Sequence, residues 1–297
     1  MKTVTIGIPA YNEEANIGNL LEGLLKLTRN DFRLKKIIIA SDGSTDNTVP
    51  IIRSIKAKNI QIVDNKIRKG TAIMLNQIIS KSDSDILVIV NADIVIYDSL
   101  FISKIINPIL NNKADLVSVP IIEISSNNVL SKALKLSMEL KSKVFDFYRK
   151  GDNVYTCHGP ARAFSKKLYQ KITFKTSIGE DAYSYLFCKV NHFKYQYVKS
   201  TAVYYKLPDN FKDHRNQSIR FINSKSLMKQ YFGEEFVANN YLIPKKILFK
   251  ITLKYFLTNP VGLIYYLLIL LVSHLMSIFA KNTINTWIIS NSSKVLE

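Results

Sequence analysis

Residues 86–93 read Ile-Leu-Val-Ile-Val-Asn-Ala-Asp, an apolar run that ends in polar side chains. A short continuous run of β-branched and aliphatic residues is typical of a strand buried on both faces of a parallel sheet. Upstream of it, apolar runs alternate with stretches of helical spacing, in the order 3–9, 16–27, 36–40, 46–58, 60–64 and 70–80. The alternation predicts an α/β fold, with a Rossmann-like, doubly wound, mostly parallel sheet that helices flank.

The pattern downstream of this run is more helical. We expect helices at 129–149, 179–188 and 211–231, and a further strand at 159–164. Open α/β sheets bind their ligands outside the carboxyl ends of the strands. The residues that follow each predicted strand are therefore the first candidates for a functional site.

The first two predicted strands end in acidic stretches, Pro-Ala-Tyr-Asn-Glu-Glu at 9–14 and Ser-Asp-Gly-Ser-Thr-Asp at 41–46. Acids ahead of a helix also suit the positive end of its dipole, so Glu13 has a purely structural explanation as well. Asp42 differs because it precedes the helix cap, at the end of its strand. Its carboxylate is placed to accept a hydrogen bond from the N–H of a nucleotide base.

The next two strands lead into a basic turn and an acidic one. Lys69 precedes the third predicted helix, where a cation is locally unfavourable unless an anion such as diphosphate binds. A solvated basic loop is the alternative. Asp93 follows the fourth strand, at a position suited to a divalent metal that bridges two phosphates. Asp98 is expected to be only a helix cap.

Five motifs in this order resemble those of the family 2 glycosyltransferases, which have the GT-A fold. They are Pro-Ala-Tyr-Asn-Glu-Glu, Asp-Gly-Ser-Thr-Asp-Asn-Thr, Lys-Gly with Asn76 downstream, Asn-Ala-Asp, and Gly-Glu-Asp at 179–181. Each motif is weak alone, but five in order and at the right spacing, over about residues 3–225, are specific.

The resemblance implies a nucleoside diphosphate sugar donor, Mg²⁺ or Mn²⁺, and inversion at the anomeric carbon. It implies that Asp181 is the general base, because an inverting transfer needs a carboxylate that takes the proton of the acceptor hydroxyl. It also implies that Asp93 binds the metal, which offsets charge on the leaving diphosphate. The residues that it places around the donor are Pro9, Ala10, Tyr11, Glu13, Asp42, Lys69, Asn91 and Glu180.

Two features qualify this assignment. Asn91 stands where the family normally has Asp, and because Asn adds no charge, a weaker metal site is expected. Gly followed by two acids is also an ordinary helix start, so the role of Asp181 depends on the upstream motifs.

Two later stretches resemble acceptor-side elements of the family. His158 opens the sequence His-Gly-Pro-Ala-Arg, which is similar to a loop where a small residue admits the sugar. Gln217, Arg220 and Phe221 form a degraded version of the Gln-x-x-Arg-Trp signature of polysaccharide synthases. The resemblance implies diphosphate contact for Arg220 and stacking on an acceptor sugar for Phe221. An amphipathic helix is the alternative, and His214 is a candidate third metal contact.

The C-terminal part has a different composition. Residues 261–280 contain no Lys, Arg, Asp or Glu, and about 20 apolar residues suffice to cross a bilayer. The lysine-containing stretch 247–257 suits a helix that lies in the membrane interface. We therefore expect a GT-A domain at 1–240 and a membrane-associated segment at 241–297. A buried helix or a dimer contact is the alternative for 261–280, which leaves a homo-oligomer open.

The formal net charge is +18, which suits a phosphorylated substrate or an anionic membrane. Nucleic acid is not expected as a partner, because no basic run is interleaved with aromatic residues and no known module is recognisable. The two cysteines suggest no disulfide framework, and no secretory signal is expected. Lysines cluster on the catalytic side of 261–280, which predicts that the catalytic domain lies on the cytoplasmic side of the cell membrane.

Together these features predict a hexosyl- or N-acetylhexosaminyltransferase that acts on a lipid-linked or glycan acceptor. One alternative is a nucleotidyltransferase with a similar sheet. That class usually has a Gly-rich loop with a basic residue after the first strand, where this chain has Pro-Ala-Tyr-Asn-Glu-Glu. The other alternative is a non-enzymatic binder of membranes or nucleic acid, which a steep salt dependence of nucleic-acid affinity would reveal.

Overall fold

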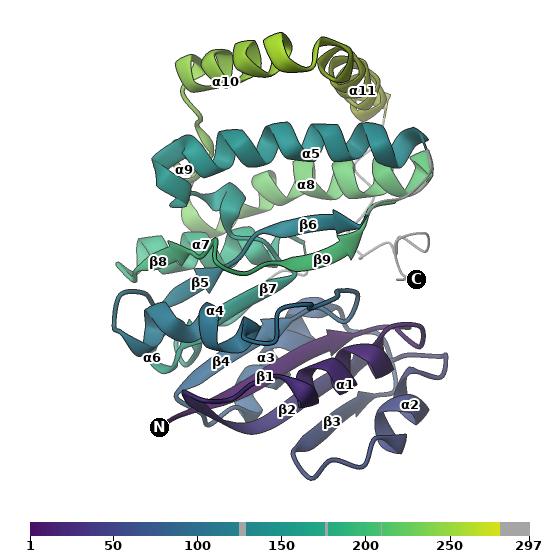
Figure 1. Ribbon diagram of the computed structural model, residues 1–297, viewed down its shortest axis with the longest axis vertical. Helices are drawn as coiled ribbons and strands as arrows, with labels where there is room; N and C mark the ends of the chain where they lie inside the picture. Colours follow the sequence, from purple (N-terminus) through teal and green to yellow (C-terminus); the bar gives the residue numbers. More distant parts are fainter. Residues whose placement is uncertain (125–128, 176–177, 209, 280–297) are drawn as a thin grey trace.

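The computed structural model describes residues 1–124, 129–175, 178–208 and 210–279. Within these residues a seven-stranded sheet has the order β3-β2-β1-β4-β7-β5-β8 (Figure 1). Its strands are β1 Lys2–Ala10, β2 Phe32–Asp42, β3 Ile60–Asn65, β4 Ile86–Val90, β5 Leu116–Ser118, β7 Ala161–Ser165 and β8 Tyr195–Tyr197. Strands β1 to β4 pair in parallel, whereas β7 runs antiparallel between β4 and β5. The predicted mostly parallel sheet is confirmed.

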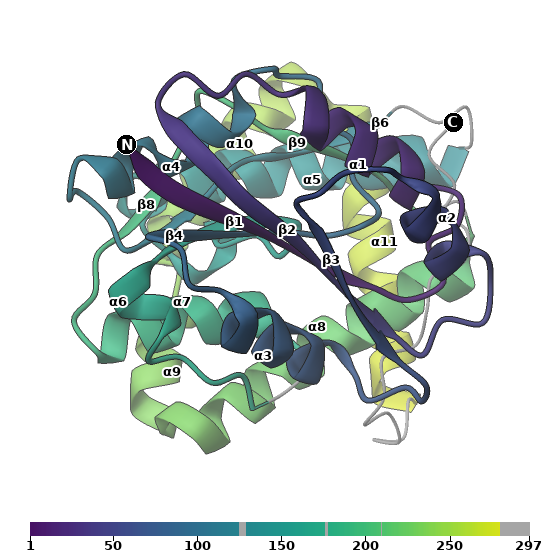
Figure 2. The same ribbon diagram turned by 90° about the horizontal axis from the view of Figure 1, so that it is seen from below.

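Helices cover the sheet on both faces (Figure 2). One face packs against α1 Ile17–Lys26, α2 Thr48–Ser54 and α4 Phe101–Leu110. The other packs against α3 Thr71–Lys81, α6 Lys166–Tyr169, α7 Glu180–Val190, α8 Phe211–Phe232 and α9 Glu234–Tyr241. All five residues of β4 are buried, because this strand is central and covered on each side. That double burial explains why its sequence is apolar throughout.

A second, two-stranded sheet was not predicted. It pairs β6 Ile121–Ile124 in parallel with β9 Val203–Lys206 (Figure 1). Strands β5 and β8 and helix α4 were also not predicted. The strands of this region are only three or four residues long, so they carry too few positions for a period of two to stand out.

The C-terminal helices α10 Lys245–Thr258 and α11 Pro260–Phe279 pack on α5 Val129–Phe147. A small core joins the three helices through Leu140, Tyr255 and Leu263. Within the described residues, no helix has the length and apolarity that a bilayer crossing requires. The finding does not support the crossing helix predicted for 261–280. Residues 280–297 of the predicted membrane-associated segment lie outside the described part of the chain.

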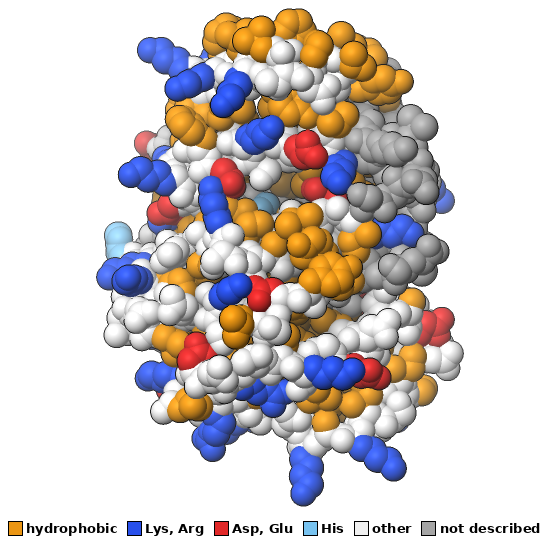
Figure 3. Space-filling model, viewed as in Figure 1, with side chains coloured by type: hydrophobic (Ala, Val, Ile, Leu, Met, Phe, Trp, Pro, Cys, Tyr) orange, Lys and Arg blue, Asp and Glu red, His pale blue; other side chains and the backbone are white. Residues whose placement is uncertain are grey.

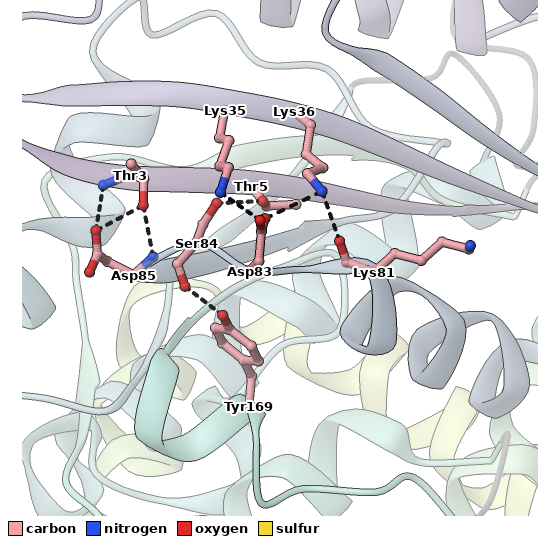
Figure 4. Close-up of polar contacts among 9 residues, drawn as sticks. All are labelled: Thr3, Thr5, Lys35, Lys36, Lys81, Asp83, Ser84, Asp85 and Tyr169. Atoms are coloured by element: carbon pink, nitrogen blue, oxygen red, sulfur yellow. Dashed lines mark hydrogen bonds and ion pairs between the residues drawn. The ribbon is translucent and has the colours of Figure 1, made fainter.

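A polar cluster anchors the amino ends of the strands, opposite the edge where β1 to β4 end (Figure 4). Asp85, just before β4, accepts hydrogen bonds from the backbone N–H and the hydroxyl of Thr3, both at 2.8 Å. In return the backbone N–H of Asp85 donates to the Thr3 hydroxyl at 3.0 Å. The hydroxyls of Thr5 and Ser84 lie 2.7 Å apart. Because β1 and β4 are neighbours, these bonds fix their register.

We expect Asp85→Asn to lower the free energy of unfolding at pH 7 by about 1 kcal/mol, allowing for the partial exposure of Asp85. The backbone and hydroxyl bonds from Thr3 lower the pKa of Asp85 below its usual value. The ionised carboxylate therefore stabilises the fold above the unfolded-state pKa of about 3.9, and this contribution is lost as the pH falls through the lower, folded-state pKa. Urea titrations of both proteins at pH 7 and at about pH 2.5 measure the difference.

Asp83→Asn is the matched control, because Asp83 is an exposed neighbour that pairs with Lys35 and Lys36 on the surface. It should change stability by no more than about 0.5 kcal/mol. Equal losses in the two variants, or a loss in Asp85→Asn that persists unchanged in acid, would contradict the proposed anchor.

Candidate active site

A cleft of about 420 Å³ opens at the carboxyl ends of β1, β2 and β4. Eleven of the residues singled out from the sequence line it, namely Pro9, Ala10, Tyr11, Glu13, Asp42, Asn91, Asp93, Glu180, Asp181, Arg220 and Phe221. They come from four strand or helix ends and from α8, far apart in the sequence. The rule that ligands bind at the carboxyl edge of an open sheet therefore locates this cleft.

The turns that follow β1 and β2 bind each other. The Asn12 backbone N–H donates to the Ser44 hydroxyl at 3.1 Å, and the Asn12 side-chain oxygen accepts from the backbone N–H of Thr45 at 2.8 Å. Asn12 adopts a positive φ of 51°, which Asn tolerates better than most residues. The backbone N–H of Glu13 donates to the buried Thr48 hydroxyl at 2.7 Å. These bonds hold the first wall of the cleft rigid.

Asp42 orders the basic turn before α3. Its carboxylate accepts the backbone N–H of Lys69 at 2.6 Å and that of Gly70 at 2.9 Å. Gly43 allows this approach, since a Cβ there would lie 2.8 Å from the backbone nitrogen of Arg68. Asp42 therefore first positions the turn, and the carboxylate can still accept from a nucleotide base at the remaining lone pairs.

Arg68 is the basic side chain that this turn places in the cleft. Its guanidinium lies 4.3 Å from the ring centroid of Tyr11, a cation–π contact that also presents a flat surface to a planar ligand. The sequence prediction chose the neighbouring Lys69. Lys69 does not line the cleft and contributes its backbone N–H instead. Sequence alone could not separate these adjacent cations, because the choice depends on how Asp42 turns the loop.

Asn91 and Asp93 follow β4 into the cleft. Mg²⁺ is commonly bound by one or two carboxylates together with substrate phosphates, so a hard-oxygen pair of this kind fits a metal that the diphosphate completes. No group of three His, Cys, Asp or Glu side chains within the described residues forms a metal cage. Arg220 lines the same cleft; burial lowers the pKa of Arg220, whereas the negative charges of Glu180 and Asp93 oppose that shift.

The amino end of α7 forms the opposite wall. Gly179 has a φ of 72°, and a Cβ there would lie 2.7 Å from Ser224 of α8. Glu180 is buried, and burial together with the adjacent Asp181 raises the pKa of Glu180 to about 7. Gly159 faces this end, because a Cβ on it would lie 3.6 Å from an Asp181 carboxylate oxygen. The small residue at 159 therefore leaves room beside Asp181.

Two other predicted residues, both histidines, do not line the cleft. His158 precedes β7 beside Tyr197, and burial lowers its pKa to about 4, so the ring is neutral at physiological pH. His214 lies on α8, where burial and Lys141 lower its pKa. Neither histidine joins Asp93 in a three-residue metal cluster of the described residues. Gln217 belongs to α8, but its side chain lies outside the described part of the structure.

Sequence reasoning missed the apolar rim. Ile121 at the start of β6, Ile178 before α7, and Met74 on α3 complete the lining. Single apolar residues carry no chemical signature, so the only signal for them is their position beside an element that ends in the cleft. The rim matters because an apolar surface can pack on the faces of sugar rings and excludes water.

The fold and the cleft together define a doubly wound α/β protein with acidic and basic side chains at the carboxyl edge of its sheet. The family model "Glycosyl transferase family 2" matches residues 5–173, which is more than half of the chain. The chain therefore belongs to glycosyl transferase family 2.

Similarity to curated proteins is local. The poly-β-1,6-N-acetyl-D-glucosamine synthase of Staphylococcus aureus strain COL is 35% identical over 97 residues, which are 32% of this chain and 23% of the relative. The synthase of Staphylococcus epidermidis is 34% identical over 92 residues, or 31% of this chain and 22% of the relative. The aligned region thus spans less than a quarter of the length of these relatives.

Solved structures share the fold over a longer stretch. The mannosyltransferase PcManGT of Pyrobaculum calidifontis, in complex with GDP-Man and Mn²⁺, has a TM-score of 0.58 and 15% identity, and covers 94% of this chain and 76% of its own. Staphylococcus aureus TarS has a TM-score of 0.55 and 17% identity, with coverage of 87% and 73%. The match in fold to these structures confirms the predicted GT-A architecture.

We expect Asn91→Asp to lower the Mn²⁺ concentration for half-maximal sugar transfer by about tenfold, because a second carboxylate beside Asp93 strengthens a hard-cation site. The measurement is a Mn²⁺ titration of transfer, paired with a thermal-shift titration in the presence of nucleoside diphosphate. Asn111→Asp, at the exposed end of α4, is the control for added charge. Identical Mn²⁺ dependence in all three proteins would show that Asn91 and Asp93 do not hold the metal.

Proposed function

We propose that the protein transfers a hexose or N-acetylhexosamine from a nucleoside diphosphate sugar to a lipid-linked or glycan acceptor, with inversion at the anomeric carbon. The observation that carries this proposal is the convergence of Asp42, Asp93 and Asp181 in one cleft. Had these side chains lain on separate surfaces, the five motifs would have had no common chemistry.

The two walls of the cleft suit different ligands. On the β1–β3 side, Tyr11, Asp42 and Arg68 suit a nucleotide, with a flat surface, an acceptor for base N–H groups and a positive charge near phosphate. On the opposite side, Asp181 together with Ile121 and Ile178 of the apolar rim suits an acceptor. The proposed roles follow from this geometry.

In the proposed reaction, Asp181 takes the proton of the acceptor hydroxyl as that oxygen attacks the anomeric carbon and the diphosphate leaves. Arg220 offsets negative charge near the leaving group, since it lines the same cleft as Asp93 and Glu180. A Mg²⁺ or Mn²⁺ ion held by Asp93 with Asn91 would supply further charge neutralisation on the diphosphate. Structures solved with Mn²⁺ support this cofactor by similarity of fold.

We also propose that the protein works on the cytoplasmic surface of the cell membrane and lies on it rather than crossing it. Figure 3 shows hydrophobic side chains gathered over α10 and α11, with basic side chains beside them. On α10, Phe249, Leu253 and Leu257 are exposed and recur every four residues, so they share one face. Lysines 246, 250 and 254 form the neighbouring stripe, which is the pattern of an interfacial helix.

Asp181→Asn should reduce turnover by about 10³-fold while the dissociation constant of the donor changes less than about threefold, because the proton acceptor is lost and the donor wall is intact. Transfer from radiolabelled UDP- and GDP-sugars measures turnover, and calorimetry measures donor binding. Glu235→Gln is the control: Gly233-Glu234-Glu235 starts α9 with the same Gly-acid-acid pattern outside the cleft. Normal turnover in Asp181→Asn would refute its role as base.

Vesicle sedimentation tests the membrane proposal. The protein should bind phosphatidylglycerol-containing vesicles, and binding should weaken with salt, because each lysine near an anionic surface contributes about 1 kcal/mol. The double variant Phe249→Ser, Leu257→Ser should bind at least tenfold more weakly, since both side chains are largely exposed and drive insertion. Val190→Ser, an exposed apolar change on α7, is the control. Equal binding by all three proteins would rule out this surface.

A further inference from the structure

Arg162 is an unusual residue for the interior of a strand. It lies in β7 with 1% of its surface exposed, and it ranks first by volume among the fully buried side chains of the described residues. Burying a guanidinium costs energy unless it is paired and hydrogen-bonded. An apolar side chain would fill this place at a lower cost in free energy, so packing alone does not explain Arg162.

The contacts of Arg162 are directed at the first turn of α7. Its Nη1 donates to the carbonyl oxygen of Glu180 at 2.8 Å and to the Ser184 hydroxyl oxygen at 2.7 Å. The Ser184 hydroxyl donates to the same carbonyl at 2.7 Å. Nη2 lies 4.0 Å from the Glu180 carboxylate. One guanidinium thus holds both the backbone and the side chain of the residue before Asp181.

The first turn of α7 is held from two other directions as well. Gly159 of the loop before β7 lies against the Glu180 and Asp181 carboxylates. Gly179 packs on Ser224 of α8 at a distance that leaves no room for a Cβ. The position of the Asp181 carboxylate therefore depends on β7, this loop and α8 together, and Arg162 makes the polar connection to β7.

We propose that Arg162 is a positioning residue. Through the carbonyl and the carboxylate of Glu180, Arg162 fixes the first turn of α7. It thereby directs the Asp181 carboxylate into the cleft and determines the charge beside that carboxylate. This inference rests on the proposed role of Asp181 as base. It assigns the pair Arg162 and Glu180 a part in the reaction, although neither is the group that removes the proton.

A role in stability alone does not account for the pair. The Nε of Arg162 finds no hydrogen-bond partner among the described residues, so its burial is incompletely compensated. Replacement of such buried pairs by apolar residues is often neutral or stabilising. An apolar residue cannot reproduce the hydrogen bonds from Nη1 to the Glu180 carbonyl and the Ser184 hydroxyl, or the positive charge 4.0 Å from the Glu180 carboxylate.

The electrostatics agree with this role. The charged groups around Glu180 are Asp181 on its own helix, Arg162 on β7 and Arg220 on α8, and the nearby Cys157 thiol stays neutral because burial raises its pKa. Burial and Asp181 raise the pKa of Glu180, whereas Arg162 and Arg220 lower it. The charge next to Asp181 is therefore set by the pair: Arg162 keeps a positive charge there, and Glu180 adds a negative charge only above its raised pKa.

The test compares the pH dependence of kcat in Arg162→Met and Glu180→Gln with that of the wild type. The acid limb is the part of the kcat–pH profile in which kcat falls as the base is protonated. Loss of the positive charge in Arg162→Met should move this limb to higher pH by about one unit, because the carboxylates nearby become easier to protonate. Glu180→Gln should leave the acid limb near its wild-type position, because a Glu180 whose pKa is raised to about 7 is already protonated over most of that limb. Misplacement of Asp181 should also lower kcat of Arg162→Met about 10- to 100-fold with little change in donor affinity.

Two controls separate positioning from stability. Arg162→Lys keeps the positive charge but loses the planar guanidinium. Its acid limb should therefore return to the wild-type position while kcat stays reduced. Leu186→Ala removes a buried side chain from the same helix, so it should lower Tm without moving the limb. An acid limb of Arg162→Met that coincides with the wild type would overturn this inference. If Asp181→Asn itself kept full turnover, the proposed role of Asp181 as base would fail first, and the two failures are thus distinguishable.

Discussion

The whole architecture depends on four parallel strands that helices cover on both faces. Because β1 to β4 are parallel, their carboxyl ends meet at one edge, and the polar residues of their following turns have to share that edge. The polar cluster of Thr3, Ser84 and Asp85 at the amino ends of β1 and β4 fixes their register. A register shift of one residue would turn the side chains after each strand to the other face. The cleft is thus a consequence of how the sheet is anchored at its far edge.

The turns at the cleft edge stabilise one another before any ligand is present. Asn12 binds the turn that follows β2, and Asp42 binds the basic turn that precedes α3. A wall whose polar groups already satisfy each other loses little conformational entropy when a ligand arrives. The same bonds explain why Arg68, and not Lys69, presents its side chain to the cleft.

The sequence predicted those parts of the fold that have a long, regular period. The buried run of β4 and the apolar face of α1 identified the parallel half of the sheet, and the turn acids located most of the cleft. The sequence could not predict β6 and β9, because each strand has only four residues. It also could not predict that β7 is antiparallel, because the direction of a strand does not change its local residue pattern. It could not separate Arg68 from Lys69 or reveal the buried contacts of Arg162. Those features depend on residues that only the folded chain brings together.

The reversed direction of β7 affects how the residues of the two cleft walls are distributed along the sequence. Parallel strands end at the cleft, whereas β7 begins there, so the chain turns back into the sheet directly after Gly159 and Pro160. The wall that suits a nucleotide is formed by one unbroken stretch, residues 9–93. The facing wall is assembled from separate pieces of β6, the loop before β7, α7 and α8. The first wall could be exchanged between proteins of this architecture as one continuous sequence segment. The second wall could be changed only by separate substitutions in several segments.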